Sequence, residues 1–144
     1  MQLWRISNFP DLSGLGGVKI AGRWHPKGHH VVYCADHPST ALLETLVHAT
    51  RHTVPGTFQL HRIEVGDDID ALESSLRQAW RDDLAYTQQK GLAFLKDGKY
   101  ALMKVPSIVM PKANNYILNP AHAASSRITI AESWRFPFDS RLLR

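Results

Sequence analysis

The 144-residue sequence lacks several features that would place it in a familiar class of protein. Its single cysteine, Cys34, excludes an intrachain disulfide framework and fits a reducing compartment, where we interpret it as a buried, unreactive thiol. No apolar run approaches the roughly 20 residues of a membrane-spanning helix. Residues 1–11 lack the basic and apolar regions of a secretory signal. These absences predict a cytoplasmic protein without a membrane anchor.

Long runs of one charge are also missing. The formal net charge is +4, from 17 basic and 13 acidic residues. Seven of the 13 acids fall between residues 64 and 83, which leaves both ends of the chain net positive. Such a field attracts a phosphate-bearing small molecule, a nucleic acid or an acidic partner, and charge alone does not choose among them.

Two common kinds of site lack their sequence patterns. Although His25, His29 and His30 lie close together, there is no paired-histidine helix motif and no CxxC, so we predict no metal site. The glycines of residues 10–22 do not form a dinucleotide-binding fingerprint, because no strand runs straight into them and Lys19 stands where a third glycine is needed. We interpret this segment as a flexible loop.

The sequence does contain a series of short strands and a few helices. β-prone runs predict strands at residues 2–6, 30–35, 57–65, 100–105 and 127–130, and an apolar segment at residues 134–138 closes the edge of the core. Helices are predicted at residues 38–50, after a cap at Asp36, and over most of residues 67–98. The length suits one domain, so we predict a single α+β domain over residues 1–144.

Two of these elements carry more detailed expectations. In the helix at residues 38–50, four residues recur at the spacing of a buried face: Leu43, Leu46, Val47 and Thr50. Glu44 lies beside this face. In the strand at residues 57–65, the apolar parity switches between Leu60 and Ile63, which predicts a bulge or an edge position.

One stretch, AGRWHPKGHHVVYCADHPSTALLETLVH, carries the residues best suited to chemistry. Gly22 and Gly28 bracket Arg23, so the backbone there can bend sharply and approach a ligand. Tyr33 follows on a strand, and Glu44 falls about two turns into the next helix. If strand and helix pack together, the side chains of Arg23, Tyr33 and Glu44 can point into one cleft.

Polar residues in the last third of the chain allow two interpretations. Ser107 ends a strand, where it is either a hydrogen-bonded structural hydroxyl or a functional group. Asn114, Asn115 and Asn119 are typical of turns and caps, and they too can be functional.

Five pieces in this order, AGRWHPKG, VVYCA, ALLETL, KVPSIVMP and NNYILNP, resemble the RES domain, a family named after its Arg, Glu and Ser. The resemblance spans nearly the whole chain and implies a fold like that of the ADP-ribosyltransferases, with short strands in a split sheet and flanking helices. RES proteins are toxins of bacterial toxin–antitoxin pairs, usually encoded with a helix-turn-helix antitoxin, and they consume NAD+. We therefore expect a growth-arresting enzyme that cleaves the nicotinamide–ribose bond of NAD+, its substrate rather than a cofactor, with such an antitoxin as its partner.

Carried over residue by residue, the resemblance implies a catalytic set of Arg23, Tyr33, Glu44 and Ser107. It also implies NAD+ contacts by Arg23, Tyr33, Trp24, Asn115 and Asn119. The chain departs from its relatives at His25, where they commonly have Asn, so no amide contacts the ligand from this position. It departs again at Phe94, where many have Trp, which we interpret as a packing change.

The chemistry of these residues fits the implied reaction. Breaking the nicotinamide–ribose bond generates an oxocarbenium-like cation, which a carboxylate such as that of Glu44 stabilises. Arg23 offers a forked donor for the diphosphate, and Tyr33 an aromatic face for the nicotinamide. Ser107 can orient Glu44 or Arg23 by a hydrogen bond.

Three alternatives remain open. The first is transfer of ADP-ribose to phosphate or to a protein. Arginine-directed transferases typically carry Glu or Gln two residues before the catalytic Glu, and Leu42 at that position favours a small acceptor. The second is a nucleic-acid-binding or ribonuclease toxin; since an aromatic-interleaved basic stripe is missing, we expect no direct nucleic-acid binding. The third is a module that only docks a partner.

Overall fold

The computed structural model describes residues 1–50 and 52–143, and seven strands form its framework. In chain order the strands are β1 (Gln2–Ile6), β2 (Val32–Ala35), β3 (Thr57–Glu64), β4 (Ala71–Glu73), β5 (Leu102–Pro106), β6 (Asn114–Leu118) and β7 (Thr129–Pro137). They make one sheet in the order β4-β5-β6-β2-β1-β3-β7. All neighbouring strands are antiparallel except β4 and β5, which are parallel.

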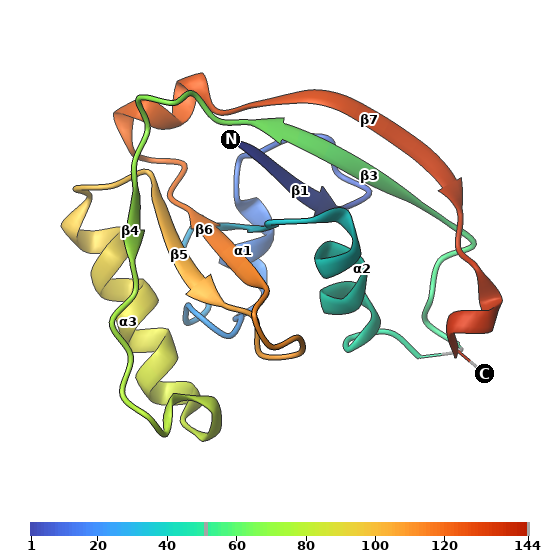
Figure 1. Cartoon of the computed structure of the whole chain (residues 1–144), viewed down its shortest axis with the longest axis horizontal. Helices are drawn as coiled ribbons and strands as arrows, with labels where there is room; N and C mark the ends of the chain where they lie inside the picture. The colour runs from blue at the N-terminus through green and yellow to red at the C-terminus, as the bar shows by residue number, and fades with distance from the viewer. Residues whose placement is uncertain (51, 144) are drawn as a thin grey trace.

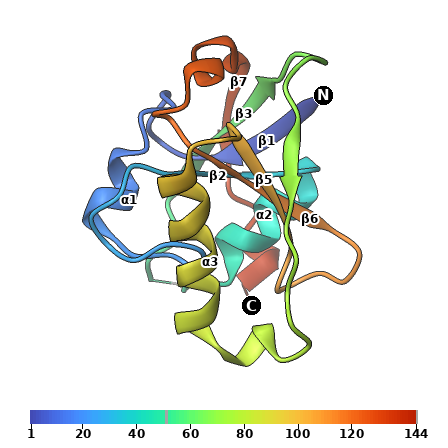
Figure 2. The same cartoon turned by 90° about the vertical axis from the view of Figure 1, so that its left-hand side faces the viewer.

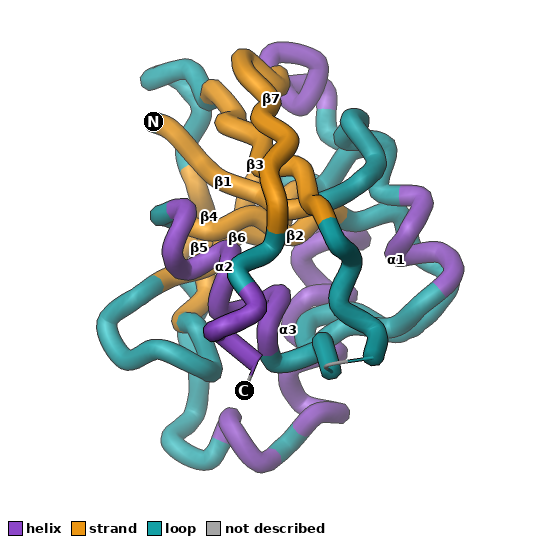
Figure 3. Tube along the Cα trace, turned by 90° about the vertical axis from the view of Figure 1, so that its right-hand side faces the viewer, coloured by secondary structure: helices purple, strands orange, loops and turns teal. Residues whose placement is uncertain are grey.

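The helices are short, apart from one. They are α1 (Leu15–Lys19), α2 (Pro38–Leu46) and α3 (Leu84–Asp97), with 3₁₀ turns η1 (Trp80–Asp82), η2 (Ala123–Arg127) and η3 (Ser140–Leu143). Figure 2 shows α3 lying along one half of the sheet, and in Figure 3 both α2 and α3 lie below the strands. Among the described residues, no helix is long and apolar enough to cross a membrane.

The sheet is split at the contact between β1 and β2. These two strands share a single register pair, Trp4 with Ala35, so β4, β5, β6 and β2 form one half and β1, β3 and β7 the other (Figure 1). The main core fills the space between the halves, where Leu3 and Ile63 pack in one cluster with Leu102. The structure therefore confirms the expected single α+β domain with a split sheet and flanking helices.

A second core lies between α3 and its half of the sheet. Phe94 of α3 packs against Met103 and Val105 of β5, and Trp24 is buried in the same cluster. Gly91 lets α3 approach closely, because a Cβ at this position would overlap the carbonyl oxygen of Trp24. This contact fixes the turn that contains Arg23 against α3.

Some local predictions are wrong. Residues 67–83 contain no α-helix, since β4 pairs with β5, the backbone N–H of Ser74 donates to the carbonyl of Lys104, and α3 begins only at Leu84 after the 3₁₀ turn η1. Hydrogen bonds at the sheet edge here override helical periodicity. The predicted loop at residues 10–22 contains α1, and one continuous strand, β7, covers residues 129–137, so it joins most of the two segments predicted at 127–130 and 134–138.

The strand predicted at residues 57–65 is confirmed, and the switch in its apolar parity reflects an irregular register rather than an edge position. The register between β3 and β7 shifts between Arg62 and Ile63, and β3 lies between β1 and β7. β7 takes the edge position instead, which agrees with its exposed residues.

Candidate active site

The orientation of α2 differs from the prediction and turns Glu44 toward the sheet. Leu43 and Val47 are 37% and 54% exposed, whereas Thr40 and Ala41 are buried. Glu44 follows Thr40 and Ala41 by one turn, so it lies on their side of the helix. The helix also ends at Leu46, earlier than predicted.

Asp36 sets this orientation by a contact that the sequence does not reveal. The predicted cap is wrong, because the N-cap is His37, whose ring nitrogen accepts a hydrogen bond from the backbone N–H of Ser39. The carboxylate of Asp36 instead accepts from the hydroxyl of Thr40 at 3.0 Å and from the backbone N–H of Asn114 at 2.8 Å. These bonds join the first turn of α2 to the start of β6, beside Asn115.

Glu44 is held by two donors on one of its oxygens. The hydroxyl of Ser107 donates to Oε1 at 2.7 Å, and Nδ2 of Asn115 donates to the same atom at 2.8 Å. No described residue donates to Oε2. We call Glu44, Ser107 and Asn115 the Glu44 cluster.

Ser107 is nearly inaccessible, with 1% of its surface exposed, and its hydroxyl has a defined direction. Its oxygen accepts from the backbone N–H groups of Val109 and Met110 at 3.3 and 3.2 Å, so its proton points to Glu44. On Asn115, the Oδ1 atom is buried and has no partner among the described residues. The cluster therefore orients one carboxylate rigidly and leaves one of its oxygens available.

Arg23 lies in a turn that α3 holds by its backbone. Thr87 Oγ1 donates to the carbonyl of Arg23 at 2.7 Å, and Gln88 Nε2 donates to the carbonyl of Gly22 at 3.0 Å. The guanidinium of Arg23 donates to the carbonyl of Arg81 in η1 at 3.3 Å. Arg81 in turn donates from Nη1 to the carbonyl of Ile108 at 2.9 Å, next to Ser107. Arg81 thus links Arg23 to the residue that follows Ser107 of the Glu44 cluster. The sequence analysis missed Arg81 because no local motif marks it.

Tyr33 has its hydroxyl fixed by protein groups. The backbone N–H of Trp24 donates to Oη at 3.1 Å, and Nδ1 of His25 lies 2.6 Å from the same atom. Nε2 of His25 lies 3.0 Å from the carbonyls of Gly17 and Ile20, which only accept, so Nε2 carries the proton and Tyr33 donates to Nδ1. Burial raises the pKa of Tyr33 above its usual value and lowers that of His25. The ring of Tyr33, which is half-buried, is the part left for a ligand.

Two predicted NAD+ contacts are not supported by the positions of their residues. Trp24 is 2% exposed, and its ring packs against Trp80 with centroids 5.8 Å apart, so it belongs to the core. Asn119 is 4% exposed and follows the far end of β6 from Asn115. Its Oδ1 accepts from the backbone N–H of Ala121, which makes it a turn residue.

Burial explains Cys34 as a structural residue. Cys34 is buried and its pKa is raised to about 12 by desolvation, as expected for an unreactive thiol. Within residues 1–50 and 52–143, no three His, Cys, Asp or Glu side chains form a metal-binding group. A surface cavity of about 380 Å³ lies beside Trp80, Lys104 and Pro106, but Glu44 is not among its lining residues.

The profile of the RES domain matches residues 2–139 of this chain. The chain belongs to the RES domain family. Its RES relatives include two proteins named Toxin Res: that of Pseudomonas putida is 42% identical over 147 residues, covering 99% of both chains, and that of Yersinia enterocolitica is 35% identical over 151 residues, again covering 99% of both. A Sphingobium protein named Prs ADP-ribosylating toxin is 30% identical over 156 residues, covering 99% of this chain and 97% of that protein.

The fold of this RES domain is also similar to a solved structure. A chain of the M. tuberculosis MbcT–MbcA toxin–antitoxin complex superposes with a TM-score of 0.76 at 19% identity, covering 94% of this chain and 84% of that one. The family and its named relatives make this protein a member of a family of toxins.

Proposed function

We propose that this RES protein is the toxin of a toxin–antitoxin pair and that it hydrolyses NAD+ at the nicotinamide–ribose bond. The observation that carries the proposal is the Glu44 cluster, in which two donors hold Oε1 of Glu44 while Oε2 is left without a donor from the described residues. The name of the Sphingobium relative, an ADP-ribosylating toxin, supports chemistry at the same bond. NAD+ is the substrate, and the proposal requires no metal or cofactor.

The reaction depends mainly on a single carboxylate, that of Glu44. As the bond between C1′ of the ribose and the nicotinamide nitrogen breaks, positive charge develops on the ribose, and Oε2 of Glu44 stabilises it or binds the ribose hydroxyls. The nicotinamide takes the bonding electrons and leaves neutral, so a general acid is not needed. Water then adds to C1′ and loses a proton, giving ADP-ribose.

The neighbouring residues position the reactants. Ser107 and Asn115 are positioning residues, because they reach the substrate only through Glu44. Arg23, connected to the cluster through Arg81, supplies donors for the diphosphate. Tyr33 offers its ring to the nicotinamide, since its hydroxyl is already bonded to Trp24 and His25.

The direct test measures nicotinamide released from NAD+ by the purified protein. We expect release by the wild type and a loss of at least about 100-fold for Glu44→Gln, which keeps the shape of the side chain and removes its charge. Leu43→Gln, on the exposed side of the same helix, is the matched control and should retain full activity. Equal release by the wild type and Glu44→Gln contradicts the proposal.

A second candidate function is transfer of ADP-ribose to another acceptor, which the name of the Sphingobium relative favours. Free ADP-ribose as the only product supports hydrolysis. A phosphorylated ADP-ribose, formed only when inorganic phosphate is present, indicates phosphorolysis. A mass increase on a protein indicates protein modification.

We further propose that a helix-turn-helix antitoxin binds this protein and that the toxin acts in the cytoplasm. The similar fold in a toxin–antitoxin complex supports an antitoxin partner, and the type of antitoxin follows from the family resemblance. Expression of the toxin alone should stop growth as cellular NAD+ falls, and co-expression with the product of the neighbouring gene should restore both. Growth arrest with unchanged NAD+ would favour a different target.

A further inference from the structure

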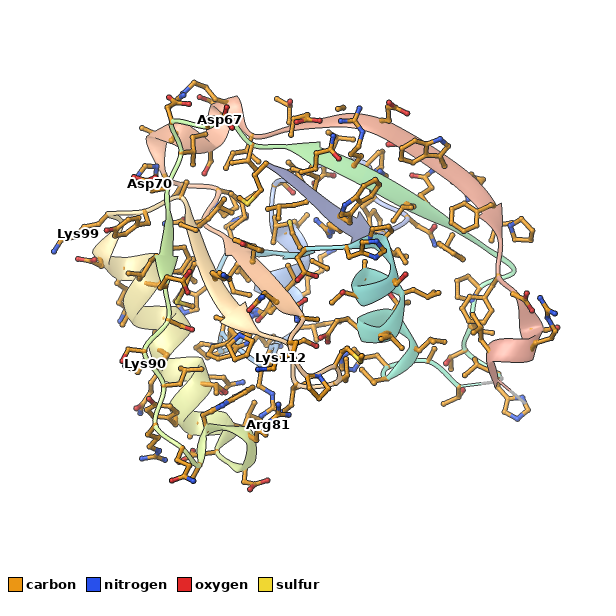
Figure 4. All side chains as sticks on the ribbon, in the orientation of Figure 1. Asp67, Asp70, Arg81, Lys90, Lys99 and Lys112 are labelled. Atoms are coloured by element: carbon orange, nitrogen blue, oxygen red, sulfur yellow. The ribbon has the colours of Figure 1, made fainter. Side chains whose placement is uncertain are left out.

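Arg81 has no contact with the substrate in the mechanism proposed above. It lies in η1 between β4 and α3, where its guanidinium carbon stands 5.0 Å from the ring centroid of Trp80. Its Nη1 donates to the backbone carbonyl of Ile108 at 2.9 Å, which joins η1 to the loop that follows β5. Figure 4 labels Arg81 together with Lys112, another cation, which belongs to that loop.

Arg81 differs in its contacts from the arginines that pair with acidic side chains. Four arginines form ion pairs with carboxylates of this chain: Arg62, Arg77, Arg127 and Arg141. Arg81, Arg23, Arg5 and Arg135 form no such pair with any described residue, and Arg5 and Arg135 donate to the hydroxyls of Ser7 and Thr57. Arg81 and Arg23 differ from these two as well. Their guanidinium groups donate only to backbone carbonyls, at 2.9 and 3.3 Å, and the carbonyl that Arg23 contacts is that of Arg81 itself.

The Arg23 guanidinium thus lies against the backbone of Arg81, and the Arg81 guanidinium lies against Ile108, the residue after Ser107, so both lie near the Glu44 cluster without an internal anion. The only carboxylate of that cluster already accepts from Ser107 and Asn115. A hydrogen bond from a guanidinium to a neutral carbonyl is weaker than one to a phosphate oxygen, so an arriving phosphate can displace Ile108 as the partner of Arg81. The ring of Trp80 supports the plane of the guanidinium while this exchange takes place.

We propose that Arg81 is a second binding residue for the diphosphate of the substrate, acting beside Arg23. This inference rests on the proposed NAD+ cleavage for the identity of the substrate, and it adds a determinant of specificity. Two adjacent forked donors match a diphosphate better than a single phosphate. The site should then select dinucleotides over nicotinamide mononucleotide and nicotinamide riboside.

The experiment measures binding of ADP-ribose, AMP and adenosine to the whole protein by calorimetry, which does not depend on catalysis. Arg81→Ala should weaken binding of ADP-ribose about tenfold or more, the scale of a lost charge-assisted hydrogen bond, and leave that of adenosine unchanged. Arg81→Lys, which keeps the charge without the fork, should lie between.

The matched control is Arg77→Ala in the same segment. Arg77 also stacks on an aromatic ring, with its guanidinium carbon 4.3 Å from the centroid of Tyr86, but it is paired with Asp83. The Arg77→Ala variant should bind ADP-ribose within about twofold of the wild-type affinity, the scale of a lost surface contact. Urea unfolding of each variant separates a loss of binding from a loss of folding.

The outcomes separate this inference from the proposed function. Arg81→Ala protein that binds ADP-ribose as tightly as the wild type overturns the role of Arg81, even if the wild type releases nicotinamide. An equal loss of adenosine binding, or wild-type protein that binds ADP-ribose no better than adenosine, also overturns it. ADP-ribose binding that depends on Arg81, without nicotinamide release, upholds the diphosphate site and contradicts hydrolysis.

Discussion

Replacing Gly91 by alanine should separate α3 from the turn that carries Arg23. A Cβ at position 91 would overlap the carbonyl oxygen of Trp24 and lie 2.7 Å from its carbonyl carbon. Carbon atoms in ordinary contact are about 3.5–4.0 Å apart, and the overlap with the oxygen is deeper still, so the helix must retreat by more than about 1 Å. A movement of this size is enough to break the hydrogen bonds that Thr87 and Gln88 of α3 donate to this turn.

The energetic consequence follows from what the retreat breaks. The bonds from Thr87 to the carbonyl of Arg23 and from Gln88 to that of Gly22, now 2.7 and 3.0 Å, would both be stretched beyond hydrogen-bonding distance. Overpacking costs about 1–3 kcal/mol, each lost bond about 1 kcal/mol, and alanine regains about 1 kcal/mol as the better helix former. We expect the free energy of unfolding to fall by about 2–4 kcal/mol.

Urea unfolding followed by tryptophan fluorescence measures this effect directly. With a slope of about 2 kcal/mol per molar urea, in the middle of the usual range, the midpoint should fall by about 1–2 M, and nicotinamide release should fall because Arg23 is displaced. Gly16→Ala is the matched control, since this helical glycine in α1 has no atom within 4 Å of a Cβ, and it should be neutral or stabilising. If both variants unfold at the same urea concentration, the reasoning about close approach is refuted.

Three further predictions concern groups in and around the site. Asn115→Ala should lower kcat for NAD+ cleavage about tenfold, because the hydrogen bond to Glu44 is lost. Asn119→Ala should leave kcat intact and lower the free energy of unfolding by about 1–3 kcal/mol. The reverse pattern would contradict the positions of the two residues. Cys34 should resist iodoacetamide at pH 8 in the folded protein and react once urea unfolds it, as mass spectrometry can show. Burial holds the pKa of His25 below its ordinary 6.5, so the unfolded chain takes up the proton first. Stability should therefore fall as the pH drops below about 6.5, by up to about 1.4 kcal/mol per pH unit, and His25→Asn should flatten that slope in urea titrations at several pH values.

Most strands could be predicted because their signal is local. Runs such as QLWRI and TFQLHRIEV are β-prone, and β1 and β3 occupy them. Residues 67–79 could not be predicted in the same way, because their apolar spacing also fits a helix. Pairing of β4 with β5, some 30 residues away, decided their structure.

The candidate site was predicted in part. Motif order identified Glu44 and Ser107 as functional candidates, and the structure brings them within hydrogen-bonding distance. The predicted contact of Trp24 with NAD+ is not supported by its position, because a residue next to a candidate site residue in sequence can point into the core. Arg81 was missed because its importance lies in contacts with Ile108 and Arg23, far away along the chain.

The sequence by itself determined the family, most of the strands and the residue types available for chemistry, because motifs and periodicity depend on nearby residues. Only the tertiary structure decided which face of α2 is buried, which oxygen of Glu44 is left open and which arginines lack a carboxylate partner. Each of these depends on contacts between segments distant in the chain, such as Asp36 with Asn114 and Arg81 with Ile108. Such contacts leave no local pattern, since they are set by how the two halves of the sheet and the helices pack together.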